Sequence, residues 1–106
     1  MALPKIETIN DLNSILNDNK NVIIEVYATW CEPCRHIAPF FYEMAHANKH
    51  VLAAKCNCDD AEEVVRKLGI TSIPTFIKFE NGKQVAIVYG PEKEEIRRLF
   101  MDKASL

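Results

Sequence analysis

The stretch VIIEVYATWCEPC, residues 22–34, leads from a strand into a pair of cysteines at the start of a helix. Residues Val22–Ala28 are nearly all apolar or β-branched, which is typical of a strand buried on both faces. A helical pattern follows from about Cys34 to Asn48, and Pro39 must kink or interrupt it. In α/β proteins, reactive groups lie at the carboxyl ends of strands. We therefore expect the functional site at this corner.

Runs of apolar and β-branched residues on both sides of the corner predict further strands. The last two runs are separated by Asn81 and Gly82, a strong signal for a two-residue hairpin. The first run is short and is expected at a sheet edge. The predicted strands are Lys5–Thr8, Val22–Ala28, Val51–Cys58, Thr75–Phe79 and Gln84–Tyr89.

The helices between these strands are marked by their ends. Thr8 and Asp11 have the spacing of a capping box, as do Asp60 and Glu63. Pro91 suits the first position of the last helix. The other markers are the helix stops at Asn19–Asn21 and Gly69, and the inner stripe Ile96, Leu99 and Phe100.

The predicted order of elements is β-α-β-α-β-α-β-β-α. Strands joined through helices are expected to be parallel, and the Asn81-Gly82 hairpin adds an antiparallel strand. This order predicts the α/β class, with one mixed sheet and helices on both faces. A length of 106 residues favours a single domain, residues 1–106.

Composition excludes several classes of protein. With 13 basic and 15 acidic residues the net charge is −2, so no nucleic-acid partner is expected. The apolar runs are far shorter than a membrane span, and the N-terminus lacks the basic and apolar segments of a secretory signal. Four cysteines in a chain with ample core residues fit a reducing compartment, so a cytoplasmic location is predicted.

Cys31 and Cys34 are spaced to close a small disulfide ring. Cys31 lies at a helix N-terminus, where free N–H groups and the positive end of the dipole favour a thiolate. Pro33 stiffens the turn, and Trp30 places a flat apolar surface beside it. These features predict thiol–disulfide exchange, with Cys31 attacking and Cys34 resolving the mixed disulfide.

A zinc-binding module is the alternative, because a Cys-x-x-Cys pair is also half of a zinc site. Cys56 and Cys58 would supply the other two thiolates. Their alternation along a predicted strand instead favours two small positions in the core.

Glu25 interrupts the buried strand, where a lone carboxylate is expensive. Desolvation should raise its pKa, so that Glu25 can transfer a proton near neutral pH. Strand alternation places Glu25 on the same face as Ile23 and Tyr27. The simpler alternative is that Glu25 only pairs with a lysine.

Taken together, YATWCEPC (residues 27–34), the helical Pro39, GITSIPTF (residues 69–76) and the late Gly90 resemble the thioredoxin family. The resemblance runs from about Thr8 to the C-terminal helix. It implies a mixed central sheet flanked by helices, agreeing with the predicted order. It also implies a dithiol reductase of protein disulfides that needs no bound cofactor besides its own redox-active disulfide.

The family also implies roles for individual residues. Cys31 would be the nucleophile and Cys34 the resolving thiol, with Pro74 in cis beside them. Trp30, Ile73 and Gly90 would line the groove for an extended substrate peptide. Thioredoxin reductase would restore the dithiol with NADPH, since the chain has no G-x-G-x-x-G motif of its own.

Two residues depart from the family pattern. Glu25 stands where the family usually has Asp, and Glu32 where it usually has Gly. Lys55 matches the family lysine near the buried acid and is its expected partner. Glu32 adds negative charge beside the helix terminus, so we expect it to raise the pKa of Cys31, an effect that Arg35 would partly offset.

Overall fold

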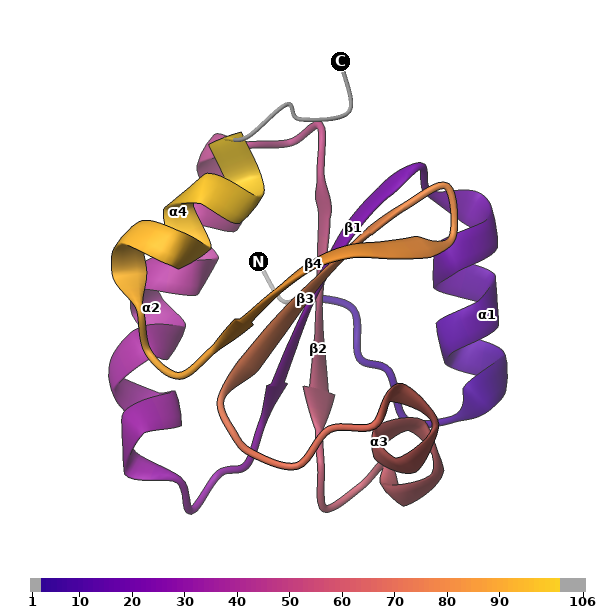
Figure 1. The fold of residues 1–106 in the computed structure, drawn as a ribbon, viewed down its shortest axis with the longest axis horizontal. Helices are drawn as coiled ribbons and strands as arrows, with labels where there is room; N and C mark the ends of the chain where they lie inside the picture. The colour runs from indigo at the N-terminus through magenta and orange to yellow at the C-terminus, as the bar shows by residue number, and fades with distance from the viewer. Residues whose placement is uncertain (1–2, 102–106) are drawn as a thin grey trace.

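The computed structural model describes residues 3–101, in which four strands form one sheet (Figure 1). The strand order is β2-β1-β3-β4, so β1 and β3 lie in the middle. The strands are β1 (Asn21–Tyr27), β2 (Leu52–Asn57), β3 (Thr75–Glu80) and β4 (Lys83–Tyr89). The helices are α1 (Ile9–Asp18), α2 (Glu32–Ala47), α3 (Glu62–Leu68) and α4 (Lys93–Met101).

Helices cover both faces of this sheet, as the sequence predicts. Figure 1 shows α2 and α4 on one side of the sheet, and α1 and α3 on the other. Alternation along β1 supplies both layers, because Ile23 packs with α2 and α4 while Ile24 packs with the opposite cluster. The layer beneath α2 and α4 centres on the rings of Phe41, Phe76 and Phe100.

The direction of β3 differs from the sequence prediction. β1 and β2 are parallel, but β3 follows a helix and is nevertheless antiparallel to β1. Helix α3 has seven residues and spans only about 10 Å, too short to return the chain along the full length of β2. The chain therefore enters β3 at the end of the sheet where β2 finishes.

The hairpin between β3 and β4 is as predicted. Asn81 and Gly82 both have positive φ angles, 54° and 79°. Positive φ at both central residues is the signature of a type I′ turn, whose twist matches that of paired strands. The first predicted strand is shorter than expected, because Lys5 makes only an isolated bridge to Lys55.

Three helix starts were predicted from end markers in the sequence, and the structure bears out one of them. The capping box of Thr8 and Asp11 is present at the start of α1. The predicted box of Asp60 and Glu63 is not formed, since α3 begins at Glu62 with no side-chain cap. Pro91 lies two residues before α4, in the turn that follows β4.

The remaining helix features are simpler. Helix α2 continues through Pro39 to Ala47. Gly69 ends α3 in the left-handed conformation, as a helix-stopping glycine does. None of the helices described is long and apolar enough to cross a bilayer.

Candidate active site

Four chain segments converge at one end of the sheet. The carboxyl ends of β1 and β2 meet there because these strands are parallel. Since β3 runs the other way, the segment Ile73–Pro74 that precedes it reaches the same end, and β4 returns there at Gly90. Backbone bonds join the segments, with Gly90 N–H donating to the Pro74 carbonyl at 2.8 Å and Cys58 N–H to the Tyr27 carbonyl at 2.8 Å.

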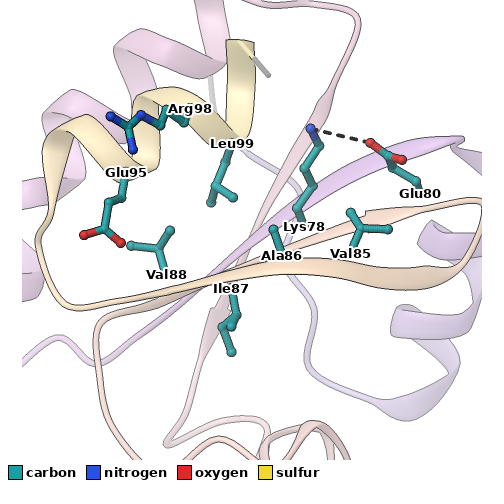
Figure 2. A pocket seen from close by; sticks show the side chains of 9 residues that line it. All are labelled: Lys78, Glu80, Val85, Ala86, Ile87, Val88, Glu95, Arg98 and Leu99. Carbon is teal, nitrogen blue, oxygen red and sulfur yellow. Dashed lines mark ion pairs between the residues drawn. The ribbon is translucent and has the colours of Figure 1, made fainter. Parts of the chain in front are cut away.

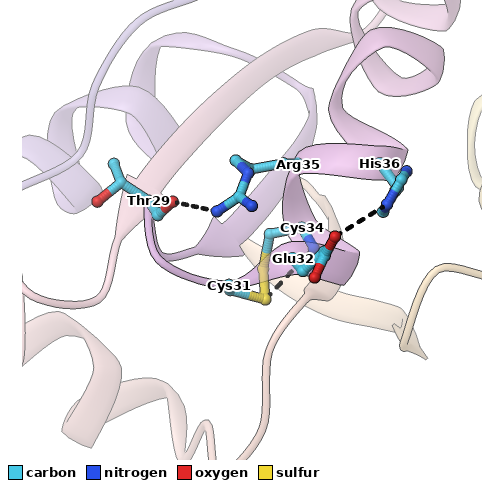
Figure 3. Close-up of polar contacts among 6 residues, drawn as sticks. All are labelled: Thr29, Cys31, Glu32, Cys34, Arg35 and His36. Carbon is cyan, nitrogen blue, oxygen red and sulfur yellow. Dashed lines mark hydrogen bonds and ion pairs between the residues drawn. A yellow bond between two sulfur atoms is a disulfide. The ribbon is translucent and has the colours of Figure 1, made fainter.

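The cysteine pair occupies the start of α2 (Figure 3). Cys31 is the N-cap residue and forms a disulfide with Cys34, with the two Cα atoms 5.3 Å apart. The Cys34 backbone N–H donates to the Cys31 sulfur at 3.3 Å. Cys31 is 6% exposed and Cys34 is 2% exposed, so Cys31 is the sulfur that a partner can reach more readily. The disulfide therefore lies at the junction of β1 and α2, as the sequence predicts.

Charged side chains surround the first turn of α2. Glu32 lies in that turn with Pro33, and its carboxylate is 3.7 Å from the His36 imidazole (Figure 3). Arg35 donates through Nη1 to the Thr29 carbonyl at 3.1 Å, which ties the helix to the loop after β1. Sequence reasoning did not anticipate the pairing of Glu32 with His36, although its i, i+4 spacing is a signal for it.

Trp30 forms one wall of an apolar hollow beside the disulfide. Its side chain is 66% exposed, and its indole N–H donates to Asp59 Oδ2 at 2.8 Å. The hollow has a volume of about 210 Å³. It is lined by Trp30, Cys58, Val65, Ile70, Thr71, Ser72 and Ile73.

Two further predicted site residues adjoin this region. The Ile73–Pro74 peptide bond is cis. Gly90 has a φ of 86°, a conformation that residues with a Cβ rarely adopt. Ile73 packs against Cys31 and Cys34, so the predicted groove residues and the disulfide share one surface.

Glu25 lies inside the sheet face that α2 covers. It is 2% exposed, and its Oε2 atom has no hydrogen-bond partner within the described residues. Burial raises the pKa of Glu25 to about 7, against an opposing influence from the Lys55 ammonium on the neighbouring strand. Glu25 and Cys34 line the same small cavity of about 170 Å³. The predicted buried acid therefore shares a cavity with Cys34.

The other two cysteines do not complete a metal site. Cys56 is fully buried in the core on the α1 and α3 side, as expected. Cys58 lies past the end of β2, half-buried, and packs against both that core and the disulfide, which differs from the prediction of a simple core position. Nowhere in residues 3–101 do three or more His, Cys, Asp or Glu side chains group to hold a metal. The zinc alternative is not supported.

A separate cavity lies between α4 and the outer part of β3 and β4 (Figure 2). Its volume is about 260 Å³, and the buried Lys78 ammonium at its wall is 3.5 Å from the Glu80 carboxylate. None of the predicted site residues lines it. This cavity is distinct from the disulfide site.

The site therefore holds two sulfurs that can alternate between a disulfide and a dithiol, next to a buried acid and an apolar groove. Residues 5–102 match the model of the Thioredoxin family. The chain belongs to the thioredoxin family. Like other thioredoxins, it is a protein-disulfide oxidoreductase that acts by dithiol–disulfide exchange.

Individual relatives support the same assignment. Thioredoxin 1 of Plasmodium falciparum is 35% identical over 90 residues, covering 85% of this chain and 86% of the relative. Thioredoxin-1 of Caenorhabditis elegans is 35% identical over 86 residues, covering 81% and 75%. Among solved structures, Fasciola hepatica thioredoxin is 32% identical with a TM-score of 0.90, covering 93% of this chain and 97% of that one.

Sequence reasoning did not place Asp59, Cys58 or Tyr42 at the thioredoxin site. Asp59 accepts a hydrogen bond from the Trp30 indole, Cys58 lines the apolar hollow beside the disulfide, and Tyr42 lines the cavity that holds Glu25. Cys58 and Asp59 follow the carboxyl end of a parallel strand, a position that was a usable signal for them. Tyr42 had none, because its place depends on how α2 packs on the sheet.

Proposed function

We propose that Cys31 and Cys34 divide the reduction of a protein disulfide between them. The Cys31 thiolate attacks one sulfur of the substrate disulfide, which forms a mixed disulfide and releases the other substrate sulfur as a thiolate. The Cys34 thiolate then attacks the Cys31 sulfur, which releases the second substrate thiol and leaves the Cys31–Cys34 disulfide. The observation that carries this assignment is the position of Cys31 at the N-cap of α2, where a backbone N–H already points at its sulfur.

Glu25 is assigned the proton transfer in the second step. Cys34 must lose its proton before it attacks, and a carboxylate with a pKa near neutrality is suited to accept it. The support for this role is that Glu25 is buried, lacks a partner at Oε2, and lines one cavity with Cys34. Lys55, paired with Glu25 across β1 and β2, tunes the charge of that acid.

The groove residues are assigned to substrate binding. Trp30 offers an exposed apolar face, and Ile73 packs against the disulfide. The backbone at Ile73 would pair with an extended substrate segment, with Pro74 and Gly90 shaping the floor beside it. Glu32 and Pro33, in the first turn of α2, would adjust the ease with which Cys31 ionises.

The partners follow from the family chemistry. Thioredoxins act on disulfide substrates and are reduced in turn by a reductase. For this chain we assign an NADPH-dependent thioredoxin reductase as the electron donor, with residues 1–106 acting as one thioredoxin domain. A cytoplasmic location is supported by the two free thiols of Cys56 and Cys58, which a reducing compartment preserves.

The test couples NADPH consumption, through a thioredoxin reductase, to reduction of a protein disulfide. Cys31→Ser should abolish turnover. Cys34→Ser should halt after one attack and accumulate a mixed disulfide, visible as a mass increase of the complex. Cys56→Ala is the matched control, since this buried thiol is outside the site and its loss should leave turnover intact. Normal turnover by Cys34→Ser would contradict the assignment.

A further inference from the structure

Tyr42 lies on α2, eight residues after Cys34, and no sequence pattern singled it out. Its ring faces the Lys55 ammonium, which is 6.0 Å from the ring centroid, at the limit of a cation–π contact. Tyr42 also lines the cavity of about 170 Å³ that holds Glu25 and Cys34. The Tyr42 ring therefore lines the cavity and also faces the Lys55 ammonium, whose charge lowers the pKa of Glu25.

Lys55 is placed to pair with Glu25 but forms no ion pair with it within the described residues. The two residues are partners in the parallel register of β1 and β2, so their side chains leave the same face of the sheet. No ion pair joins them in the part of the chain described, and Oε2 of Glu25 is without a hydrogen-bond partner there. A buried carboxylate so close to a lysine would ordinarily be expected to recruit it.

We propose that Tyr42 is a positioning residue, whose ring holds the Lys55 ammonium away from the Glu25 carboxyl group and closes the cavity between Glu25 and Cys34. The inference deepens the proposed function, because it rests on Glu25 being the acid that serves Cys34. The proposed role of Tyr42 is to keep Glu25 able to exchange a proton near neutral pH.

The other groups around Glu25 do not supply this control. Arg35 lines the same cavity, but its guanidinium is bound to the Thr29 carbonyl on the loop. Tyr27 lies on the same strand face, and burial together with Tyr42 and Glu25 raises its pKa, so it is uncharged at neutral pH. Lys55 is the charged group that acts on Glu25, and Tyr42 is the ring in contact with it.

Removing the Tyr42 ring should lower the pKa of Glu25 in two ways. The Lys55 ammonium becomes free to approach Glu25, which favours the carboxylate. Water also enters the opened cavity, and solvation favours the carboxylate again. Both effects move the Glu25 titration to lower pH, so that Glu25 is a weaker proton acceptor for Cys34 at neutral pH.

The direct test is the pH titration of the Glu25 carboxyl carbon by ¹³C NMR, assigned by its loss in Glu25→Gln. The disulfide form is used, because Cys31 and Cys34 then do not titrate. In Tyr42→Ala the midpoint should fall by about one pH unit. Tyr42→Phe, which keeps the ring, should titrate like the wild type. If the alanine variant does not fold, Tyr42→Leu replaces it, since leucine keeps apolar volume but has no π face. Its Glu25 midpoint should also fall.

An unmoved midpoint in the folded alanine or leucine variant overturns the proposal, as does a shift in Tyr42→Phe as large as that in the variant lacking the ring. The pH profile of disulfide reduction is then measured in parallel. If the Glu25 midpoint moves but the reduction profile does not, the positioning by Tyr42 is upheld, and it is the catalytic role of Glu25 in the proposed function that fails.

Discussion

Charged groups in the first turn of α2 lie near Cys31, the residue that we propose attacks the substrate disulfide. Cys31 accepts a backbone hydrogen bond from Cys34 at the positive end of the helix, which favours the thiolate. Glu32 shares that turn, and a negative side chain there competes with the thiolate for the same positive potential. Protonated His36, 3.7 Å from Glu32, would partly neutralise that competition.

Replacing Glu32 should therefore make Cys31 easier to ionise. In reduced Glu32→Gly and Glu32→Gln, the thiolate absorbance should rise at lower pH than in the wild type. A charge at a helix end is worth about 0.3–1 kcal/mol, so about two to five times more thiolate is expected below the midpoint. The glutamine variant is the control for backbone flexibility. A titration unchanged or moved to higher pH in both would contradict this interpretation of Glu32.

Among the helices, α1 and α3 differ in what satisfies their first N–H groups. In α1 the Thr8 hydroxyl accepts from Asp11 N–H at 3.0 Å, and the Asp11 carboxylate accepts from Thr8 N–H at 3.0 Å. The backbone N–H groups of Glu7 and Thr8, which both donate to the Asp11 carboxylate, lower the pKa of Asp11. Before helix α3 the same spacing, Asp60 and Glu63, lies one residue too early, because the N-cap is Ala61 and the helix begins at Glu62 without a side-chain cap. The N-cap residue of α1, Thr8, is extended, whereas Ala61 at the same position of α3 has a ψ of 50°.

Thr8→Ala should destabilise the protein by about 1 kcal/mol, because it removes the acceptor for the Asp11 N–H. Urea unfolding followed by far-ultraviolet circular dichroism measures the change. Thr8→Ser keeps the hydroxyl and should retain most of the stability. Reductase activity is expected to be unaffected, since the cap is outside the redox site. Equal stability of the alanine variant and the wild type would show that the cap contributes nothing.

For the molecule as a whole, Glu25 makes the fold dependent on pH. Its pKa is raised by burial from 4.5 to about 7 in the folded protein, so the folded state binds the proton more tightly than the unfolded chain. The associated stability is fully present below about pH 4.5 and is lost as the pH rises to about 7. The difference corresponds to about 3 kcal/mol.

Glu25→Gln should remove this dependence. Between about pH 4.5 and 7, the free energy of unfolding should fall in the wild type relative to the variant, and the two should run parallel above that range. Urea titrations at several pH values measure the difference, with the disulfide intact in both proteins. Because other groups titrate equally in both, their contributions cancel. Parallel curves throughout would mean that Glu25 is not a strained buried acid.

Local sequence patterns identified most of the elements and the chemistry. The run Val22–Ala28 indicated a buried strand, the pair Cys31 and Cys34 indicated disulfide exchange, and Asn81-Gly82 indicated the hairpin. Each of these signals is contained within a few consecutive residues. The buried acid at Glu25 was also predictable from the sequence. A carboxylate in an apolar strand costs free energy to bury, and such groups concentrate at functional sites.

Packing decided what those patterns left open. The sequence favoured a parallel β3, which would have carried Ile73–Pro74 to the opposite end of the sheet from the disulfide; the short α3 reverses that strand and brings the proline beside the cysteines. Likewise, Tyr42 and Asp59 reach the site only because α2 and the end of β2 fold over it. The sequence by itself determined the elements and the reactive sulfurs, since these depend on neighbouring residues. Tertiary structure alone determined which distant residues surround the sulfurs, because strand direction and helix docking are set by burying the whole core at once.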